Sequence, residues 1–165
     1  MSNQQSEQCV RTFIDAFYAG DAARMEQCCD DAFTSLVYAP VEVFPHLGLK
    51  QGKAWVAKAI QIQQERYSSR RHIIDFVVAN ETHGAAFVQA TLTKRSDQRI
   101  IRLNIGEFFT LRSGRIAEHR VGGLVAAPQF GFVDHVVMQQ RGGVDELHHR
   151  REFTMVVTPA PGSTR

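Results

Sequence analysis

The stretch FFTLRSGRIAEHR, residues 108–120, decides the fold. Aromatic and β-branched residues on both sides of Ser113-Gly114 predict two strands joined by a tight turn. This hairpin ends a run of four strand-like segments separated by short turns: HIIDFVVA (72–79), AAFVQATLTKR (85–95), RIIRLNIGEFFTLR (99–112) and RIAEHRVGGLV (115–125). Consecutive strands with short turns predict an antiparallel sheet, and one this long must curl or be covered.

Helical patterns come before the strands. Apolar residues recur at three- and four-residue spacing from Val10 to Tyr18, which predicts an amphipathic helix ending at Gly20-Asp21. Asp21 caps a second, short helix to about Cys28. A third is expected from Lys53 to about Tyr67. Helices on the concave face of the sheet would leave a cone-shaped cavity, so the fold class is α+β.

Between the second and third helices the pattern is less regular. FTSLVYAPVEVF, residues 33–44, is rich in β-branched and aromatic residues and predicts a strand. Pro40 inside it indicates an edge strand or a bulge. The following PHLGLKQG, residues 45–52, is predicted to be a loop.

Composition sets limits on function. The chain has 165 residues, 44% of them hydrophobic and 22% charged, which suits one globular domain. A net charge of +2 with interspersed signs gives no footprint for nucleic acid. No apolar run is long enough to span a bilayer, and MSNQQSEQ lacks the features of a signal peptide. Three cysteines, two of them adjacent, are a poor disulfide set, so we expect a cytoplasmic protein.

The order of these segments resembles the SnoaL-like polyketide cyclases of the nuclear transport factor 2-like superfamily, which includes relatives of ketosteroid isomerase and limonene epoxide hydrolase. FIDAFYAGDAARMEQCCDDAF (13–33), LKQGKAWVAKAI (49–60) and FFTLRSGRIAEHR (108–120) carry the resemblance, which covers roughly residues 7 to 125. It implies a conical barrel, a curved antiparallel sheet wrapped around N-terminal helices, with one deep apolar pocket. It also implies a homodimer formed through the sheet and chemistry without a cofactor.

The resemblance also implies positions for catalytic acids. The aspartate that polyketide cyclases carry near the end of the last strand corresponds to about Leu124, and the aspartate before a proline in ketosteroid isomerases corresponds to Ala39. Neither residue titrates. The Asp-Arg-Asp set of limonene epoxide hydrolases is not found. If residues 122–131 fold over the pocket mouth, Asp134 can return to the pocket instead.

Glu107 is the leading candidate acid or base. Alternation along its strand places it on the same face as Ile105 and Phe109. A carboxylate among apolar neighbours loses hydration, which disfavours its charged form and suits proton transfer. The alternative is a strand-end glutamate in a structural ion pair with Arg102, Arg115 or Arg120, or one placed at a bulge.

Other polar candidates follow from strand positions. Tyr38 can donate its hydroxyl to a developing oxyanion, or is a core aromatic. Glu42 shares its parity and is a second candidate carboxylate. Asn104 lies on the face opposite Glu107 and reaches a substrate only if a bulge at Gly106 shifts the register.

Three further polar side chains are interpreted from their surroundings. His46 is either a neutral-pH titrating group at the pocket mouth or an exposed loop histidine. Arg120 can pair with Glu107 across neighbouring strands. His119 points away from Arg120 and is interpreted as a satisfied sheet histidine. The aromatic residues interpreted as cavity lining, or alternatively plain core, are Phe13, Phe17, Tyr18 and Trp55. Phe109 is a further candidate for contact with the substrate.

The organisation expected is a SnoaL-like barrel domain over residues 1–127 and an extension over 128–165, with a short helix in FGFVDHVVMQQ (130–140) and a polar tail. Asp145, His148 and His149 have ligand spacing if helical, but a solvated tail is the better interpretation and no metal is expected. The leading functional hypothesis is cofactor-free acid/base chemistry on a small apolar carbonyl compound or epoxide. The alternative is a non-catalytic ligand-binding or dimeric interaction module.

Overall fold

The computed structural model describes residues 2–38, 47–126, 136–140 and 153–157. In these residues the order is α1 (Asn3–Ala19), α2 (Ala22–Gln27), β1 (Cys29–Val37), β2 (Gly48–Gln51), α3 (Ala54–Arg66), β3 (Tyr67–Ala79), β4 (His83–Lys94), β5 (Ile100–Arg112), β6 (Arg115–Ala126), β7 (Val136–Gln140) and β8 (Phe153–Val157). The α+β order expected from the sequence is confirmed. The described helices include none long and apolar enough to cross a bilayer.

The first helix has well-defined ends. Ser2 caps α1 by accepting from the backbone N–H of Gln5, whose side chain in turn accepts from the Ser2 N–H. Gly20 ends the helix in the left-handed conformation, with φ 80°, and donates to the Phe17 carbonyl. Asp21 then caps α2 through the Arg24 N–H, as the sequence predicts. The chain therefore turns sharply, and α1 and α2 form a hairpin.

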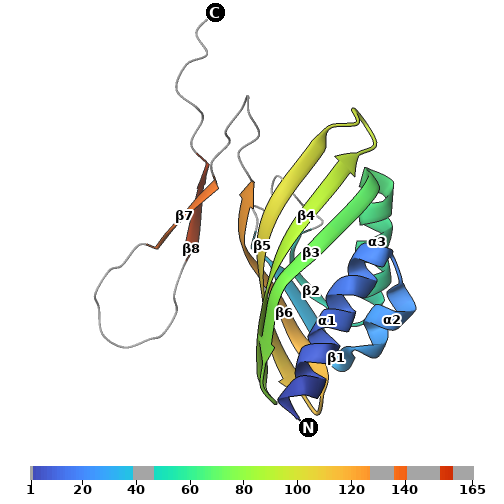
Figure 1. The fold of residues 1–165 in the computed structure, drawn as a ribbon, viewed down its shortest axis with the longest axis vertical. Helices are drawn as coiled ribbons and strands as arrows, with labels where there is room; N and C mark the ends of the chain where they lie inside the picture. Colours follow the sequence, from blue (N-terminus) through green and yellow to red (C-terminus); the bar gives the residue numbers. More distant parts are fainter. Residues whose placement is uncertain (1, 39–46, 127–135, 141–152, 158–165) are drawn as a thin grey trace, which may run out of the picture.

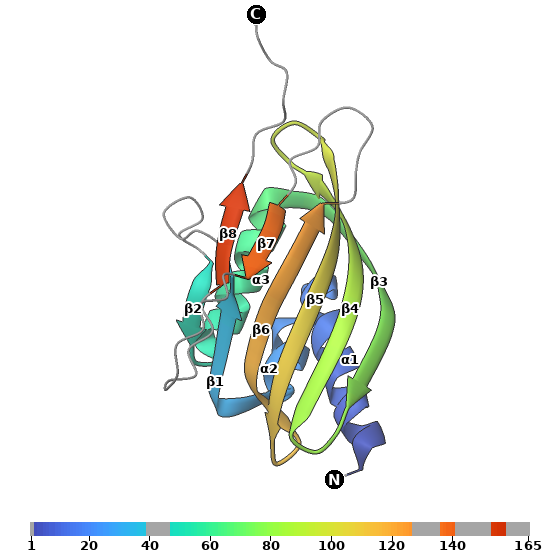
Figure 2. The same cartoon turned by 90° about the vertical axis from the view of Figure 1, so that its left-hand side faces the viewer.

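The sheet is mixed and open. Its order is β2-β1-β6-β5-β4-β3, and β1 runs parallel to β6 whereas all other neighbours are antiparallel. Figure 2 shows this order across the outer face. The segment 45–52, predicted as a loop, contains β2 instead, because Gly48–Gln51 pairs with the edge of β1. Four residues with weak strand propensity are held here by pairing, which local pattern does not encode.

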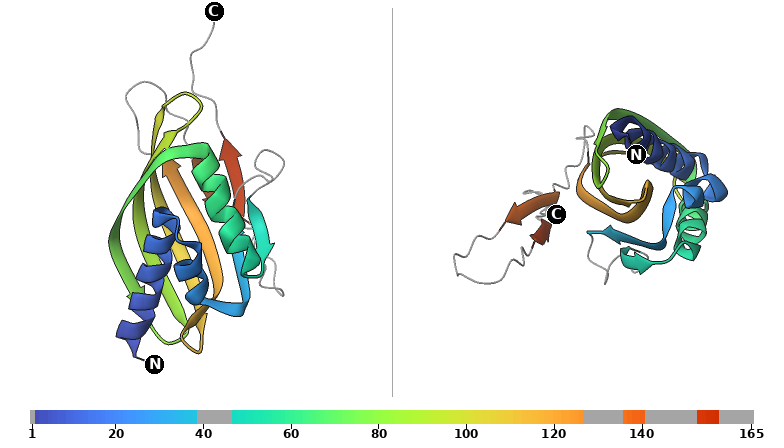
Figure 3. Two further views of the ribbon diagram at one scale, coloured as in Figure 1. Left: turned by 90° about the vertical axis from the view of Figure 1, so that its right-hand side faces the viewer. Right: turned by 90° about the horizontal axis from the view of Figure 1, so that it is seen from below.

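The helices lie inside the curve of the sheet. Figure 1 shows α1, α2 and α3 on one face, and Figure 3 shows the sheet curling around them when seen from below. Inward side chains of both layers form the core; among the most buried are Val10, Phe13, Phe33, Val88 and Ile116. Their packing supplies most of the apolar burial that stabilises the fold.

A bulge in β6 sets which side chains face inward. Leu111 pairs with Ile116, but the next residue of β5, Thr110, pairs with Glu118, so Ala117 is an extra residue. Ile116 and Ala117 are consequently both buried. Before the bulge the even-numbered residues of β6 point inward, and beyond it the odd-numbered residues do. His119 therefore points inward, opposite Phe109 on β5.

The extension differs from the prediction of a short helix. Val136–Gln140 is the strand β7, which pairs antiparallel with β8 at Phe153–Val157. The helix prediction is therefore wrong at 136–140. Adjacent valines in both segments, VVMQQ and FTMVV, favour extended backbone over helix.

Candidate functional site

A cavity of about 240 Å³ lies between the helices and the concave face of the sheet. Its walls are mostly apolar, with Ile14 and Phe17 from α1, Trp55 and Ile62 from α3, and Leu103 from β5. The polar side chains that reach it are few: Tyr18, Ser35, Lys50, Gln63, Tyr67, Glu107 and His119. An apolar pocket with a few convergent polar groups is the usual form of a small-molecule site.

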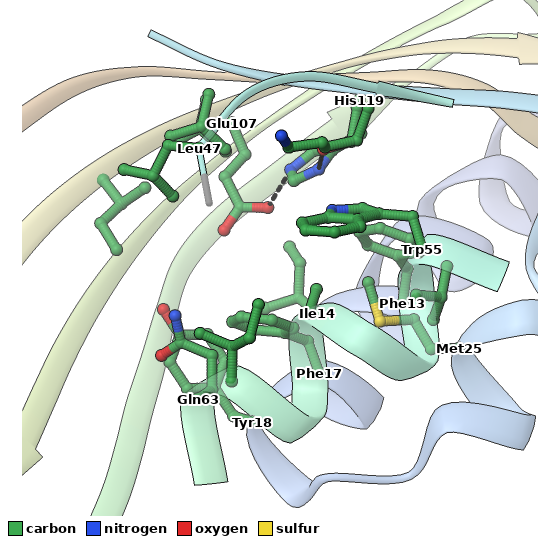
Figure 4. A pocket seen from close by; sticks show the side chains of 18 of the residues that line it. Phe13, Ile14, Phe17, Tyr18, Met25, Leu47, Trp55, Gln63, Glu107 and His119 are labelled. Carbon is green, nitrogen blue, oxygen red and sulfur yellow. Dashed lines mark hydrogen bonds and ion pairs between the residues drawn. The ribbon is translucent and has the colours of Figure 1, made fainter. Parts of the chain in front are cut away.

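Glu107 lies in this cavity, where the sequence predicted it. Its position on β5 between Ile105 and Phe109 leaves the residue only 6% exposed. The carboxylate Oε2 is 3.0 Å from Nε2 of His119, whose strand is the antiparallel neighbour. Figure 4 shows the two groups pointing toward each other from the sheet, above the side chains of the helices. Burial without a partner would be costly for this carboxylate, and His119 is that partner.

His119 makes a second hydrogen bond. Its Nδ1 lies 3.2 Å from Oγ of Ser35, the residue directly beside it on β1. The ring is also held between two aromatic side chains: it stacks on Phe109 and meets Phe13 edge-on, each with ring centroids 5.1 Å apart. Both nitrogens and both sides of the imidazole therefore have partners, and its orientation is determined.

Ser35, His119 and Glu107 therefore form a hydrogen-bonded chain of three side chains. Two arrangements of the protons satisfy both of its hydrogen bonds. In one, the Ser35 hydroxyl donates to Nδ1 and the Nε2–H donates to the Glu107 carboxylate. In the other, a protonated Glu107 donates to Nε2 and the Nδ1–H donates to the Ser35 oxygen. Each hydrogen bond is satisfied in both arrangements, because a histidine and a serine can each donate or accept. The site can therefore take up a proton at one end and release one at the other.

Tyr18 supplies a neutral donor in the same cavity. Burial, and next the negative charge of Glu107, raise the pKa of Tyr18 well above its usual value. Its phenol consequently stays protonated at physiological pH and can donate to an oxygen. On the other side, the Tyr18 ring stacks on His72 at 4.5 Å, and His72 Nε2 lies 2.8 Å from the Asp15 carboxylate. The phenol is thus held by packing.

Some of the predicted site residues line the cavity and others do not. Glu107, Phe13, Phe17 and Trp55 line the cavity, and Phe109 is buried behind His119. Tyr38 is 37% exposed and does not line it. Glu42 and His46 lie outside the described residues, as do Ala39 and Asp134.

Asn104 and Arg120 face away from the cavity. The register shift near Gly106 exists, but its extra residue is in β6, so alternation along β5 continues and Asn104 stays on the outer face. The prediction that Arg120 pairs with Glu107 is wrong. The Arg120 guanidinium instead contacts Glu118 at 2.6 Å on the outer face, because the bulge at Ala117 turns both side chains outward.

Sequence reasoning missed the roles of Ser35 and His119. The sequence pattern indicates a sheet histidine at position 119 and no site role. Its place opposite Phe109 depends on the bulge at Ala117, which the sequence does not reveal. Ser35 gave no signal, because its partner is 84 residues away. Across the described ranges, no cluster of three or more His, Cys, Asp or Glu side chains could hold a metal. The candidate set Asp145, His148 and His149 falls outside them.

Comparison with protein families finds one matching model, the SnoaL-like domain, over residues 10–119. The chain belongs to the SnoaL-like family. The match begins inside α1, at Val10, and ends at His119, so it contains Ser35, Glu107 and His119. The comparison with curated proteins finds no match for this SnoaL-like protein.

Solved structures share the fold. An NTF2-like protein of unknown function from Burkholderia pseudomallei K96243 is 17% identical, with a TM-score of 0.65 over 74% of this chain and 92% of that one. An LEH-like epoxide hydrolase of M. tuberculosis is 16% identical, with a TM-score of 0.57 over 72% and 82%. TerC, co-crystallised with polyporic acid, is 10% identical, with a TM-score of 0.64 over 72% and 91%. At these identities the likeness establishes the nuclear transport factor 2-like fold of this SnoaL-like protein and nothing finer.

Proposed function

We propose that this SnoaL-like protein is a cofactor-free enzyme, an isomerase, cyclase or epoxide hydrolase, that uses Glu107 for general acid/base catalysis on a small apolar substrate. The observation that carries the proposal is the Glu107–His119 pair, 3.0 Å apart and buried at the wall of an apolar cavity. A structural ion pair needs no access to a cavity, whereas both members of this one line it.

Three cavity groups have a part in the proposed reaction. Glu107 takes a proton from the substrate, which leaves negative charge on the substrate oxygen, and His119 holds the Glu107 carboxylate in place through their hydrogen bond. Tyr18, kept neutral by its raised pKa, donates to the substrate oxygen where negative charge develops. It takes the part that the sequence analysis gave to Tyr38 and Asn104. The fold neighbour from M. tuberculosis, an LEH-like epoxide hydrolase, is an example of such chemistry on the same fold.

The test uses a second carboxylate–histidine pair, Asp15 and His72, as a matched control, because it is more exposed and does not line the cavity. Small ketones and epoxides are screened for solvent-deuterium incorporation and for ring opening, with wild type, Glu107→Gln, His119→Gln and Asp15→Asn. We expect Glu107→Gln to lower turnover by about 100-fold or more, as for loss of a general base. Asp15→Asn should keep the activity, and circular dichroism checks the fold. Turnover unchanged in Glu107→Gln would remove the mechanism.

A second candidate function is ligand binding without chemistry. The observation that favours it is that the two positions matched to family aspartates hold Leu124 and Ala39. Binding of an apolar fluorophore such as anilinonaphthalene sulfonate would then be equal in wild type and Glu107→Gln between pH 5 and pH 9, and no substrate of the screen would turn over.

We also propose that the outer face of the sheet forms a homodimer. Ile73, Phe76, Val78 and Phe108 are each about half exposed there or more, and Phe76 stacks on Phe87. Exposed apolar side chains gathered on one face are typical of an interface. Light scattering should give twice the chain mass for wild type and the single mass for Phe76→Asp. The free thiols Cys9, Cys28 and Cys29 support a cytoplasmic location, which cell fractionation would test.

A further inference from the structure

One member of the hydrogen-bonded chain has no part in the proton transfer proposed above. Ser35 lines the cavity from β1, and its Oγ is 3.2 Å from His119 Nδ1. His119 in turn is held by Glu107 through its other nitrogen. A hydroxyl, an imidazole and a carboxylate in this order are the parts of an activated serine nucleophile: the base removes the hydroxyl proton, and the carboxylate orients the base.

From this geometry we propose that Ser35 is a nucleophile and that the protein hydrolyses small apolar carboxylic esters through an acyl-serine intermediate. This activity goes beyond the proton transfer proposed above, which forms no covalent intermediate. The two activities share His119 and Glu107, but only ester hydrolysis needs Ser35 as the attacking atom.

The arrangement of the base is rigid. The side chains of His119 and Glu107 are 11% and 8% exposed. Phe13 and Phe109 confine the imidazole from two sides, so it cannot turn away from Ser35 without displacing core aromatics. A base held in one orientation removes the proton without first losing rotational freedom, which is a large part of the advantage of a preorganised site.

A cation lies beside the nucleophile. In the register of the sheet, Ser35 has His119 as its neighbour on β6 and Lys50 as its neighbour on β2. Side chains directly opposite in an antiparallel pair have Cβ atoms about 5 Å apart. Lys50 also lines the cavity, with its ammonium 4.9 Å from the centre of the Trp55 ring. Positive charge at this position favours the oxyanion that forms when Ser35 attacks a carbonyl.

The reaction balances with water as the second substrate. Ser35 Oγ bonds to the ester carbonyl carbon while its proton passes to His119 Nδ1. The tetrahedral intermediate collapses as the carbon–alkoxy bond breaks, and the Nδ1 proton leaves with the alcohol. Water then attacks the acyl-serine, Nδ1 accepts its proton, and collapse releases the carboxylic acid and returns the proton to Ser35 Oγ. No oxidant, metal or organic cofactor enters any step.

Two measurements on the full chain test the proposal. The first treats wild type with a serine-reactive fluorophosphonate and maps the adduct by peptide mass spectrometry. We expect one adduct, on the peptide that contains Ser35, which requires no variant to fold. The second follows hydrolysis of p-nitrophenyl butyrate, with an initial burst expected from acyl-serine formation. Ser35→Ala should abolish adduct and burst, and His119→Gln should slow both at least about 100-fold.

The matched control is Ser69→Ala, since Ser69 is also half-buried on a strand but does not line the cavity. It should label and hydrolyse as wild type does. A wild-type chain without adduct, an adduct on another residue, or equal hydrolysis by Ser35→Ala would overturn the proposal. Deuterium exchange lost in Glu107→Gln while no adduct forms would leave the proton-transfer function standing. An adduct on Ser35 with no exchange in wild type would do the reverse.

Discussion

Two carboxylate–imidazole pairs are present in the described residues, and they differ in their surroundings far more than in their geometry. Glu107 and His119 are 3.0 Å apart inside the cavity, with side chains 8% and 11% exposed. Asp15 and His72 are 2.8 Å apart between α1 and β3, with side chains 47% and 20% exposed. Distance alone would rank the outer pair first.

Burial and access to the cavity, rather than contact distance, therefore distinguish a candidate site from a surface ion pair. Water competes for the Asp15 carboxylate and screens its charge, so the outer pair contributes little. The inner pair lies in a medium of low dielectric, where each hydrogen bond is stronger and the loss of either partner is costly. Only the inner pair faces space for a ligand.

The largest effect should come from His119→Leu. The substitution leaves the Glu107 carboxylate, whose residue is only 6% exposed, without the imidazole it is paired with. We expect the free energy of unfolding to fall by about 3 kcal/mol or more, because a charged group stays buried without its partner. Urea denaturation measures this loss.

The matched control is His72→Leu, which removes the corresponding imidazole from the half-exposed Asp15 carboxylate and should cost about 1 kcal/mol at most. Equal losses in the two variants would show that burial of the carboxylate does not set the cost of losing its partner.

The next effect is the difference between the coupling free energies of the two pairs. Double-mutant cycles pair Glu107→Gln with His119→Gln, and Asp15→Asn with His72→Gln. We expect a coupling free energy of about 1.5–3 kcal/mol for the inner pair and about 0.2–1 kcal/mol for the outer pair. Thermal or urea unfolding gives both values. Equal couplings would mean that burial does not distinguish the pairs.

The smallest effect concerns Tyr18, whose ring stacks on His72 and whose pKa responds to the charge of Glu107. Its pKa is raised in the folded state by burial and by Glu107, whereas in the unfolded chain it ionises near pH 10. The contribution of Tyr18 to the free energy of unfolding is therefore complete below pH 10 and decreases above it, since only the unfolded state releases the proton. Relative to Tyr18→Phe, wild type should lose about 1.4 kcal/mol between pH 8 and pH 11. A stability difference that does not change with pH would contradict this assignment.

Much of the architecture was predictable from local pattern. The apolar spacing from Val10 to Tyr18 predicted α1, and the turn at Ser113-Gly114 predicted the β5–β6 hairpin, because both signals lie within a few residues of one another. The inward position of Glu107 followed from simple alternation along β5. Prediction failed at β2, where a weak local signal is decided by pairing, and at β7, where the adjacent valines favour the strand that forms.

The helices, the run of strands and one carboxylate on an apolar strand face follow from the sequence alone, since these depend on periodicity and turn chemistry. The contact of this carboxylate with His119, and of His119 with Ser35, follows from the tertiary structure. The contact needs a one-residue bulge at Ala117 and the parallel placement of β1 beside β6. Both arise from pairing between distant segments, whose energy is shared across the sheet and leaves no local mark in the chain.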